Sequence, residues 1–199
     1  MELTDEDVVA AQWLHPGKYA LLASPTLYPG QTVCARVDAD RANEAAVFCR
    51  LTIATYDELD GLSPASGPET RLQPGQGTAL SWRVPETGGQ PVAEVGVEVR
   101  SAGPAPGAVA LDHLTWSGAP DVTLARPAGE GRMWRRAWVP AVDRFESGWP
   151  EAYRLAQNRG RGLLIQGTRE WDDYEVAAAI RPKAAAAAGI AARVQGLPR

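Results

Sequence analysis

The chain has 199 residues, of which 45% are hydrophobic, and a formal net charge of −4. This length and composition suit one large or two small globular domains, and they exclude a wholly disordered chain. No apolar run approaches the length of a membrane helix, and acidic residues follow Met1 where a signal peptide carries basic ones. We therefore expect a cytoplasmic protein without a membrane partner.

Charge is distributed unevenly along the chain. Residues 1–120 carry a net charge of −8 and residues 121–199 a net charge of +4. The change of sign supports a domain boundary near residue 120. The basic half contains the run Arg-Leu-Ala-Gln-Asn-Arg-Gly-Arg-Gly at 154–162, which lacks repeated Arg-Gly-Gly units and adjoins an apolar run. We expect a solvated loop or sheet edge there, and no nucleic-acid partner.

The first 120 residues are typical of a β-sandwich. Residues 1–14 form an acidic lead-in, of which residues 1–13 allow a helical turn or two. Strands are predicted from apolar alternation and turn signals at Tyr19–Ala23, Thr32–Val37, Val47–Tyr56, Thr78–Val84, Val92–Arg100 and Val109–Trp116. Residues 57–71 are predicted to be a polar loop. Six or seven such strands over residues 15–120 predict an all-β domain, a jelly roll or β-sandwich.

Two local patterns sharpen this prediction. Along the second long strand, Val47, Cys49, Leu51 and Ile53 alternate with more polar residues and form its core face. The pattern Leu-x-Pro-Gly-Gln occurs twice, at 27–31 and at 72–76, each time just before a predicted strand. A Pro-Gly pair suits a type II turn, so we expect one local turn structure to be used twice.

The rest of the chain predicts a linker and a second β-module. Residues 121–132 are the linker, and residues 133–199 carry strand-like runs at Leu163–Ile165, Tyr174–Ile180 and Ile190–Gln195. The alanine run 184–188 lies between Pro182 and Gly189, which leave room for little more than one helical turn, so we expect a loop or single turn. A sandwich needs more strands than these, and we expect this second module to be incomplete.

Residues capable of metal or nucleophilic chemistry are sparse. Cys34 and Cys49 are interpreted as two buried thiols, and the isolated His15 and His113 do not complete a zinc site, so no metal or cofactor is expected. Alternation places Leu111 and His113 on one face of their strand. The adjacent acids 172–173 are interpreted as a solvated turn. No hydrolase motif is present, and we predict no catalytic residues and a chain that is not an enzyme.

Sugar binding requires an aromatic platform with polar groups beside it, because sugar C–H faces stack on rings while hydroxyls form hydrogen bonds. Trp149, with Glu146 and Tyr153 close in sequence, is the best candidate in the second module. Tyr56, with Asp57 beside it, is the best candidate in the first. Most of the seven Trp residues are expected in the core.

Three segments carry a resemblance to a known family: Val-Ala-Leu-Asp-His-Leu-Thr-Trp-Ser-Gly-Ala-Pro at 109–120, Trp-Arg-Arg-Ala-Trp at 134–138, and 153–171. The chain resembles the non-catalytic carboxy-terminal region of bacterial ADP-ribosylglycohydrolase family proteins, in which two β-sandwich modules follow a helical hydrolase domain. The resemblance implies a galactose-binding-like module at 15–120 and a partial laminin-G or concanavalin-like module at 133–199. The family's magnesium-binding helical domain has no counterpart here.

These observations leave two classes of function open. The first is a non-catalytic binding or scaffolding chain, with a carbohydrate or glycoconjugate as its ligand. The alternative is a truncated or split ADP-ribosylglycohydrolase component that acts with a separate catalytic domain. An open sheet edge in the second module would also permit self-association through strand addition.

Overall fold

The computed structural model describes residues 2–3, 10–14, 27–101, 107–149, 152–168 and 171–194, the first two ranges through their backbone alone. Within these residues the regular structure consists of strands and one short 3-10 helix. Every strand pair among them is antiparallel. The chain is therefore all-β, as predicted from the spacing of its turns and strands.

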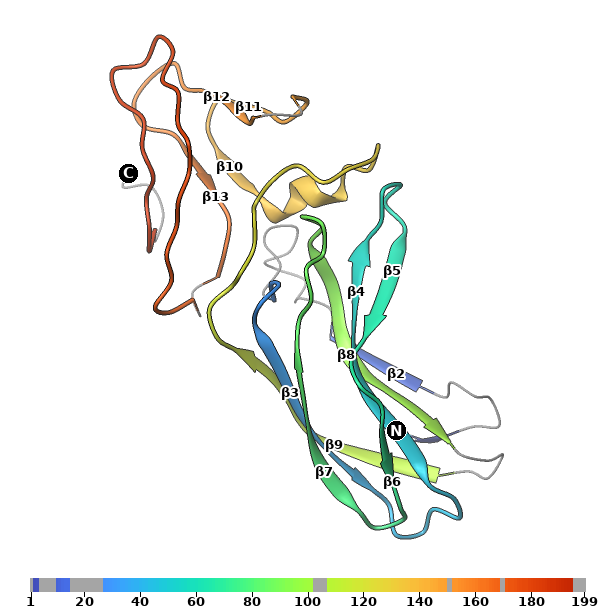
Figure 1. Ribbon diagram of the computed structural model, residues 1–199. Coiled ribbons are helices and arrows are strands. Elements are labelled where there is room, and N and C mark those ends of the chain that lie inside the picture. Colours follow the sequence, from blue (N-terminus) through green and yellow to red (C-terminus); the bar gives the residue numbers. More distant parts are fainter. Residues whose placement is uncertain are drawn as a thin grey trace.

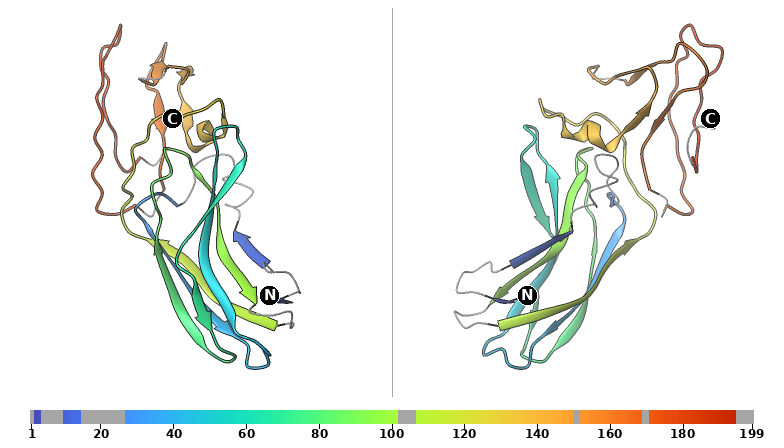
Figure 2. Two further views of the ribbon diagram at one scale, coloured as in Figure 1. Left: turned by 45° about the vertical axis from the view of Figure 1, so that its right-hand side comes forward. Right: turned by 180° about the vertical axis from the view of Figure 1, so that it is seen from behind.

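Two antiparallel sheets form a β-sandwich (Figures 1 and 2). The four-stranded sheet contains, in spatial order, β1 (Glu2–Leu3), β9 (Gly107–Ser117), β3 (Thr32–Ala39) and β7 (Gly77–Arg83). The second sheet contains, in order, β2 (Ala10–Leu14), β8 (Val92–Ser101), β4 (Val47–Tyr56) and β5 (Leu62–Ser66), with β6 (Thr70–Leu72) also paired to β4. These elements confirm the predicted strands at 32–37, 47–56, 78–84, 92–100 and 109–116.

The core lies between the two sheets and is made of small and β-branched side chains. On β4 the predicted core face is confirmed, because Val47, Cys49, Leu51 and Ile53 are all at most 2% exposed. Valines on β3 face them across the sandwich, valines on β8 lie beside them in the same sheet, and Trp82, Leu111, Leu114 and Trp116 pack at the periphery. Branched side chains suit this role because they fill a pleated surface with little loss of rotamer freedom.

The alternation predicted for the last strand of the sandwich is wrong because β9 contains a β-bulge. Arg36 pairs with His113 and Val37 with Leu111, so Asp112 is an extra residue without a partner on β3. The bulge reverses the inward and outward positions, and Leu111 and Leu114 therefore both pack on the core. His113 is exposed, with Nδ1 3.2 Å from the Asp112 carboxylate.

The prediction of a polar loop over residues 57–71 is wrong for two parts of that range, which form strands. The strands β5 and β6 pair with the second and first halves of β4 and form a broken edge strand. Pro64 is tolerated because an edge strand has no neighbour on one side that requires its missing N–H. At the break, a Cβ on Gly67 would lie 2.7 Å from the Trp82 ring of β7, so glycine allows Trp82 to close this side of the sandwich.

The amino-terminal segment also differs from the prediction. Residues 2–3 and 10–14 are strands, which pair with β9 and β8, and not the helical turns expected for residues 1–13. Backbone pairing with two existing sheet edges therefore determines their conformation. The strand predicted at Tyr19–Ala23 lies outside the described residues.

The two Leu-x-Pro-Gly-Gln segments adopt the same turn, as predicted. Gly30 and Gly75 have φ values of 89° and 77°, which favour glycine. In each turn the glutamine side chain accepts a hydrogen bond from the backbone N–H three residues earlier, at 2.9 Å for Gln31 and 2.8 Å for Gln76. Only Gln31 is buried, and its Nε2 also donates to the Gly118 carbonyl at 2.9 Å.

Beyond the sandwich, residues 133–165 form a second, smaller unit. It contains the 3-10 helix η1 (Met133–Ala137) and two sheets of two strands each. The first sheet pairs β10 (Val139–Ala141) with β13 (Leu163–Ile165), and the second pairs β11 (Arg144–Glu146) with β12 (Arg154–Ala156). The predicted strand at 163–165 is confirmed. Figure 1 shows η1 beside the tip of the β4–β5 hairpin.

The two remaining strand predictions are wrong for the residues that the structure describes. Residues 174–180 and 190–194 lie in a long exposed hairpin-like segment without a sheet ladder. Its ends meet where the Arg193 backbone N–H donates to the Tyr174 hydroxyl at 3.0 Å and the Arg193 guanidinium pairs with Asp172. The alanine run is a loop, as predicted, with Ala184 at a φ of 50°.

Candidate functional site

Three of the five candidate ligand residues lie on the β11–β12 hairpin. Glu146 is opposite Arg154 in the strand register, and Trp149 and Tyr153 follow β11 before the chain enters β12. Glu146 is engaged locally, because its Oε1 lies 2.8 Å from Arg144 Nε. The acid and both aromatic residues therefore lie on one hairpin, as their spacing in the sequence suggested.

An aromatic cluster fixes this hairpin to η1. Tyr153 lies at its centre, with ring centroids 6.0 Å from Trp134, 5.2 Å from Trp138 and 5.5 Å from Phe145. Burial raises the pKa of the Tyr153 hydroxyl from 10.0 to about 12, against the opposing effects of the Trp138 side chain and the Arg126 charge. Tyr153 thus remains neutral at physiological pH and serves as the central packing residue of the hairpin.

Trp149 differs from the cluster because its side chain is 43% exposed. The Arg154 guanidinium carbon lies 3.4 Å from the Trp149 ring centroid, a distance at which the planar group stacks on the ring face. Arg126 Nη1 donates a hydrogen bond to the carbonyl of Gly148, the residue before Trp149, at 3.2 Å. Trp149 is therefore an accessible aromatic surface with one guanidinium group on its ring and a second bonded to the residue before it.

The other two candidates lie elsewhere, at the β4–β5 turn. Tyr56 is the last residue of β4, and the Asp57 carboxylate begins the turn. Asp57 Oδ1 accepts hydrogen bonds from the backbone N–H groups of Leu59 and Gly61, each at 2.8 Å. These bonds close the turn, so the Asp57 carboxylate has a structural role there.

The same turn also contacts the segment that leads into η1, which sequence reasoning missed. Asp60 Oδ1 accepts hydrogen bonds from the backbone N–H groups of Arg132 and Met133, at 2.6 and 2.7 Å. The Glu58 carbonyl accepts two more, from Glu130 and Gly131, at 2.9 and 2.8 Å. The Asp-Gly pair at 60–61 indicates a tight turn. Nothing in the local sequence reveals that this turn contacts residues 130–133.

Removal of the Asp60 carboxylate is expected to loosen this contact. We expect Asp60→Gly to lower the free energy of unfolding by about 1–2 kcal/mol, since two hydrogen bonds to a charged acceptor are lost. Glycine accepts the φ of 69° at this position, so backbone strain does not contribute. Asp60→Asn, which retains an acceptor oxygen, is the control and should lose less. Equal stability of Asp60→Gly and the wild-type chain in urea unfolding would contradict this role.

The two thiols occupy different environments, which corrects the prediction that both are buried. Cys49 is 0% exposed, and burial, with a smaller effect of the Glu69 charge, raises its pKa from 9.0 to about 11. Cys34 is half-buried on the outer face of β3, with its sulfur 3.7 Å from the Ser81 hydroxyl.

This difference predicts selective alkylation. Iodoacetamide at pH 8 should modify one thiol in the folded protein and the second only on unfolding, because the reactive thiolate is both inaccessible and disfavoured at Cys49. Cys34→Ala should abolish the rapid reaction. Rapid modification of both thiols in the folded protein, seen by mass spectrometry, would show that the core opens readily.

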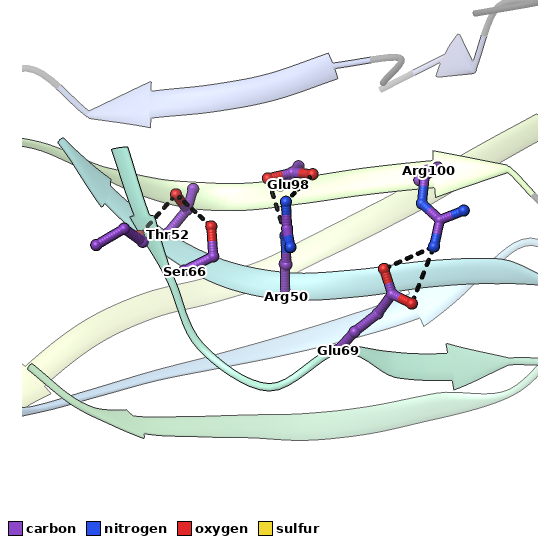
Figure 3. A network of polar contacts seen from close by, with 7 residues as sticks. Arg50, Thr52, Ser66, Glu69, Glu98 and Arg100 are labelled. Atoms are coloured by element: carbon purple, nitrogen blue, oxygen red, sulfur yellow. Dashed lines mark hydrogen bonds and ion pairs between the residues drawn. The ribbon is translucent and has the colours of Figure 1, made fainter. Parts of the chain in front are cut away.

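The outer face of the five-stranded sheet carries a cross-strand polar network (Figure 3). Arg50 forms two hydrogen bonds with Glu98, at 3.0 and 2.7 Å, and Arg100 bonds both carboxylate oxygens of Glu69, at 3.0 and 2.9 Å. Thr52 lies on the same face and donates to the Ala65 carbonyl at 3.1 Å. These four charged groups form two ion pairs. The first joins β4 to β8, and the second joins the residue before β6 to β8.

A small cavity lies between the sandwich, the linker residues that follow it and Gln166. It has a volume of about 10 Å³, enough for roughly one water molecule, and Tyr28, Gln90, Val122 and Gln166 are among its lining residues. Within the part of the chain that the structure describes, no three His, Cys, Asp or Glu side chains are grouped so as to hold a metal ion. The described residues also contain no helix long and apolar enough to cross a membrane.

The surroundings of Trp149 are therefore the part of the described structure that combines an exposed ring, charged donors and a rigid support. An aromatic surface with adjacent polar groups is suited to bind a small polar ligand through ring stacking and hydrogen bonds. No protein-family model, no curated protein and no solved structure matches this chain.

Proposed function

We propose that this chain is a non-catalytic binding module, and that it binds a carbohydrate at Trp149. The observation that carries the proposal is the 43% exposure of the Trp149 ring, on a hairpin whose neighbouring aromatic residues are packed inward. Sugar C–H faces stack favourably on such a ring. Glu146, on the preceding strand, supplies an acceptor for hydroxyl groups.

The packing below the hairpin supports this assignment. A ligand platform must be held rigidly, because ordering a mobile side chain upon binding reduces affinity. Tyr153 contacts three aromatic rings and thereby fixes the start of β12, while Arg154 stacks on Trp149. The ring is thus held in place before a ligand arrives.

The family resemblance supports an accessory role beside a hydrolase. The carboxy-terminal modules of the ADP-ribosylglycohydrolase proteins that this chain resembles accompany a catalytic domain. We include in the proposal that this chain positions a separate hydrolase domain on a carbohydrate or glycoconjugate in the cytoplasm. A pull-down of the purified chain with a candidate hydrolase domain tests this part independently of sugar binding.

Sugar binding is tested by adding a panel of neutral and acidic hexoses and their oligomers to the chain. Saturation-transfer NMR detects which sugars bind. Trp149→Ala should weaken binding of the best ligand about tenfold or more, since loss of a stacked ring removes roughly 1.5–3 kcal/mol of apolar contact. The control is Tyr56→Ala, which removes the candidate aromatic residue of the other site and should leave affinity unchanged. The proposal fails if no sugar binds, or if Tyr56→Ala abolishes binding and Trp149→Ala does not.

A further inference from the structure

The guanidinium groups of Arg126 and Arg154 have no carboxylate partner within 4.0 Å among the described residues. Six other arginines form ion pairs within 4.0 Å: Arg36, Arg50, Arg83, Arg100, Arg144 and Arg193. Arg154 instead stacks on the Trp149 ring, and Arg126 donates to the Gly148 carbonyl. One positive charge therefore lies on the ring and a second at the preceding residue, and neither forms an ion pair with a described carboxylate.

The charge of the surrounding sequence reinforces this imbalance. Residues 121–168 contain eight arginines, no lysine and five acidic residues. Glu146, which is opposite Arg154 in the strand register, is engaged by Arg144 at 2.8 Å. An arginine-rich, lysine-free surface suits recognition of planar or tetrahedral anions, because the guanidinium presents two parallel N–H groups to such a partner.

Stacking on the indole ring prepares Arg154 for this role. A guanidinium that lies flat on a ring keeps its N–H groups in its own plane, directed past the ring edge, while the ring restricts its rotation. Arg126 is half-buried and fixed by its bond to Gly148, so its charge is also held near the ring. An anion at the edge of Trp149 meets donors that are already oriented.

Resting on the proposed carbohydrate function, we propose that the Trp149 site selects sugars that carry a carboxylate, sulfate or phosphate group. The sugar ring packs on Trp149 and the anionic group bonds the Arg154 guanidinium, with the Arg126 charge in support. A neutral sugar can pack on the ring in the same way but gives the guanidinium no counter-charge. An acidic sugar therefore gains a charge-assisted hydrogen bond at the same site.

The test compares galactose with galacturonic acid, galactose 6-sulfate and galactose 6-phosphate by titration against the full chain. We expect at least one acidic sugar to bind about tenfold more tightly than galactose, and the comparison among the three identifies the anion. Arg154→Gln should remove that preference, so that the acidic sugar binds no more tightly than galactose does to the same variant. Arg161→Gln removes the same charge from another exposed position of this unit and is the matched control.

The outcomes separate this inference from the proposed function. Absence of binding by all four sugars overturns both. Equal binding of galactose and the acidic sugars, with loss on Trp149→Ala, supports carbohydrate binding and overturns the anion preference. An equal loss of acidic-sugar binding in Arg154→Gln and Arg161→Gln would indicate a general polyanion surface, of the kind that binds nucleic acid, and would also overturn the assigned site.

Discussion

Trp134→Ala is expected to unfold the unit formed by residues 133–165 while the sandwich remains folded. Trp134 is 5% exposed, its ring stacks on Tyr153, and its Nε1 donates to the Gly131 carbonyl at 3.2 Å. Removal of a buried tryptophan costs about 3–5 kcal/mol, and a unit this small has few other buried side chains to offset the loss. Hydrogen exchange of peptides that cover β10 and β13 should accelerate strongly, while peptides from β8 should not change.

Trp149→Ala is the matched control for this experiment. Its ring is 43% exposed, so the same truncation should reduce stability by less than about 1 kcal/mol. If Trp134→Ala leaves exchange in β10 and β13 at the wild-type rate, the aromatic cluster does not stabilise the unit. The support proposed for the Trp149 hairpin would then be lost as well.

Gln31→Ala is expected to destabilise the sandwich by about 2–4 kcal/mol. Gln31 is 1% exposed, its Oε1 accepts from the Tyr28 N–H, and its Nε2 donates to the Gly118 carbonyl. The substitution removes the partner of the buried Tyr28 N–H, where an unsatisfied group costs about 1–3 kcal/mol, and it also removes the bond to the Gly118 carbonyl. Urea unfolding followed by far-UV circular dichroism measures the loss.

Gln76→Ala provides an internal comparison at a near-identical turn. The Gln76 side chain makes the equivalent bond to the backbone N–H of Gln73 at 2.8 Å. This side chain is exposed and has no second partner among the described residues. Water replaces the lost bond there, so the expected cost is below about 1 kcal/mol. Equal effects of the two substitutions would mean that turn geometry, and not burial, determines the role of Gln31.

The features that the sequence predicts well are those determined by local periodicity. Alternation along residues 47–56 identifies the core face of β4, because each inward position there is held by an apolar side chain. The repeated Pro-Gly-Gln turn is predicted for a similar reason, since a glycine at positive φ and a glutamine within reach of the i−3 N–H are both local properties. The grouping of Glu146, Trp149 and Tyr153 follows from their closeness on one hairpin.

The features that escaped prediction depend on contacts between distant segments. The edge strand β5 contains Pro64 and exposed residues, and only its pairing with β4 makes it a strand. Residues 174–180 show the opposite case, because their alternation is strand-like but no described neighbour pairs with them. The bulge at Asp112 changes the faces of β9 through a register shift that side-chain patterns do not encode. Arg126 was missed as a neighbour of Trp149 because 22 residues separate it from Gly148.

Hydrogen–deuterium exchange with and without galacturonic acid tests the location of the ligand site most directly. Bound sugar should slow exchange in the peptides that cover β11 and β12, and Arg154→Gln should remove this protection. The peptides that cover β4 and β5 contain Tyr56 and Asp57, and they should show the same exchange in both conditions. Protection confined to β4 and β5, or absent throughout at a saturating sugar concentration, would contradict a carbohydrate site at Trp149.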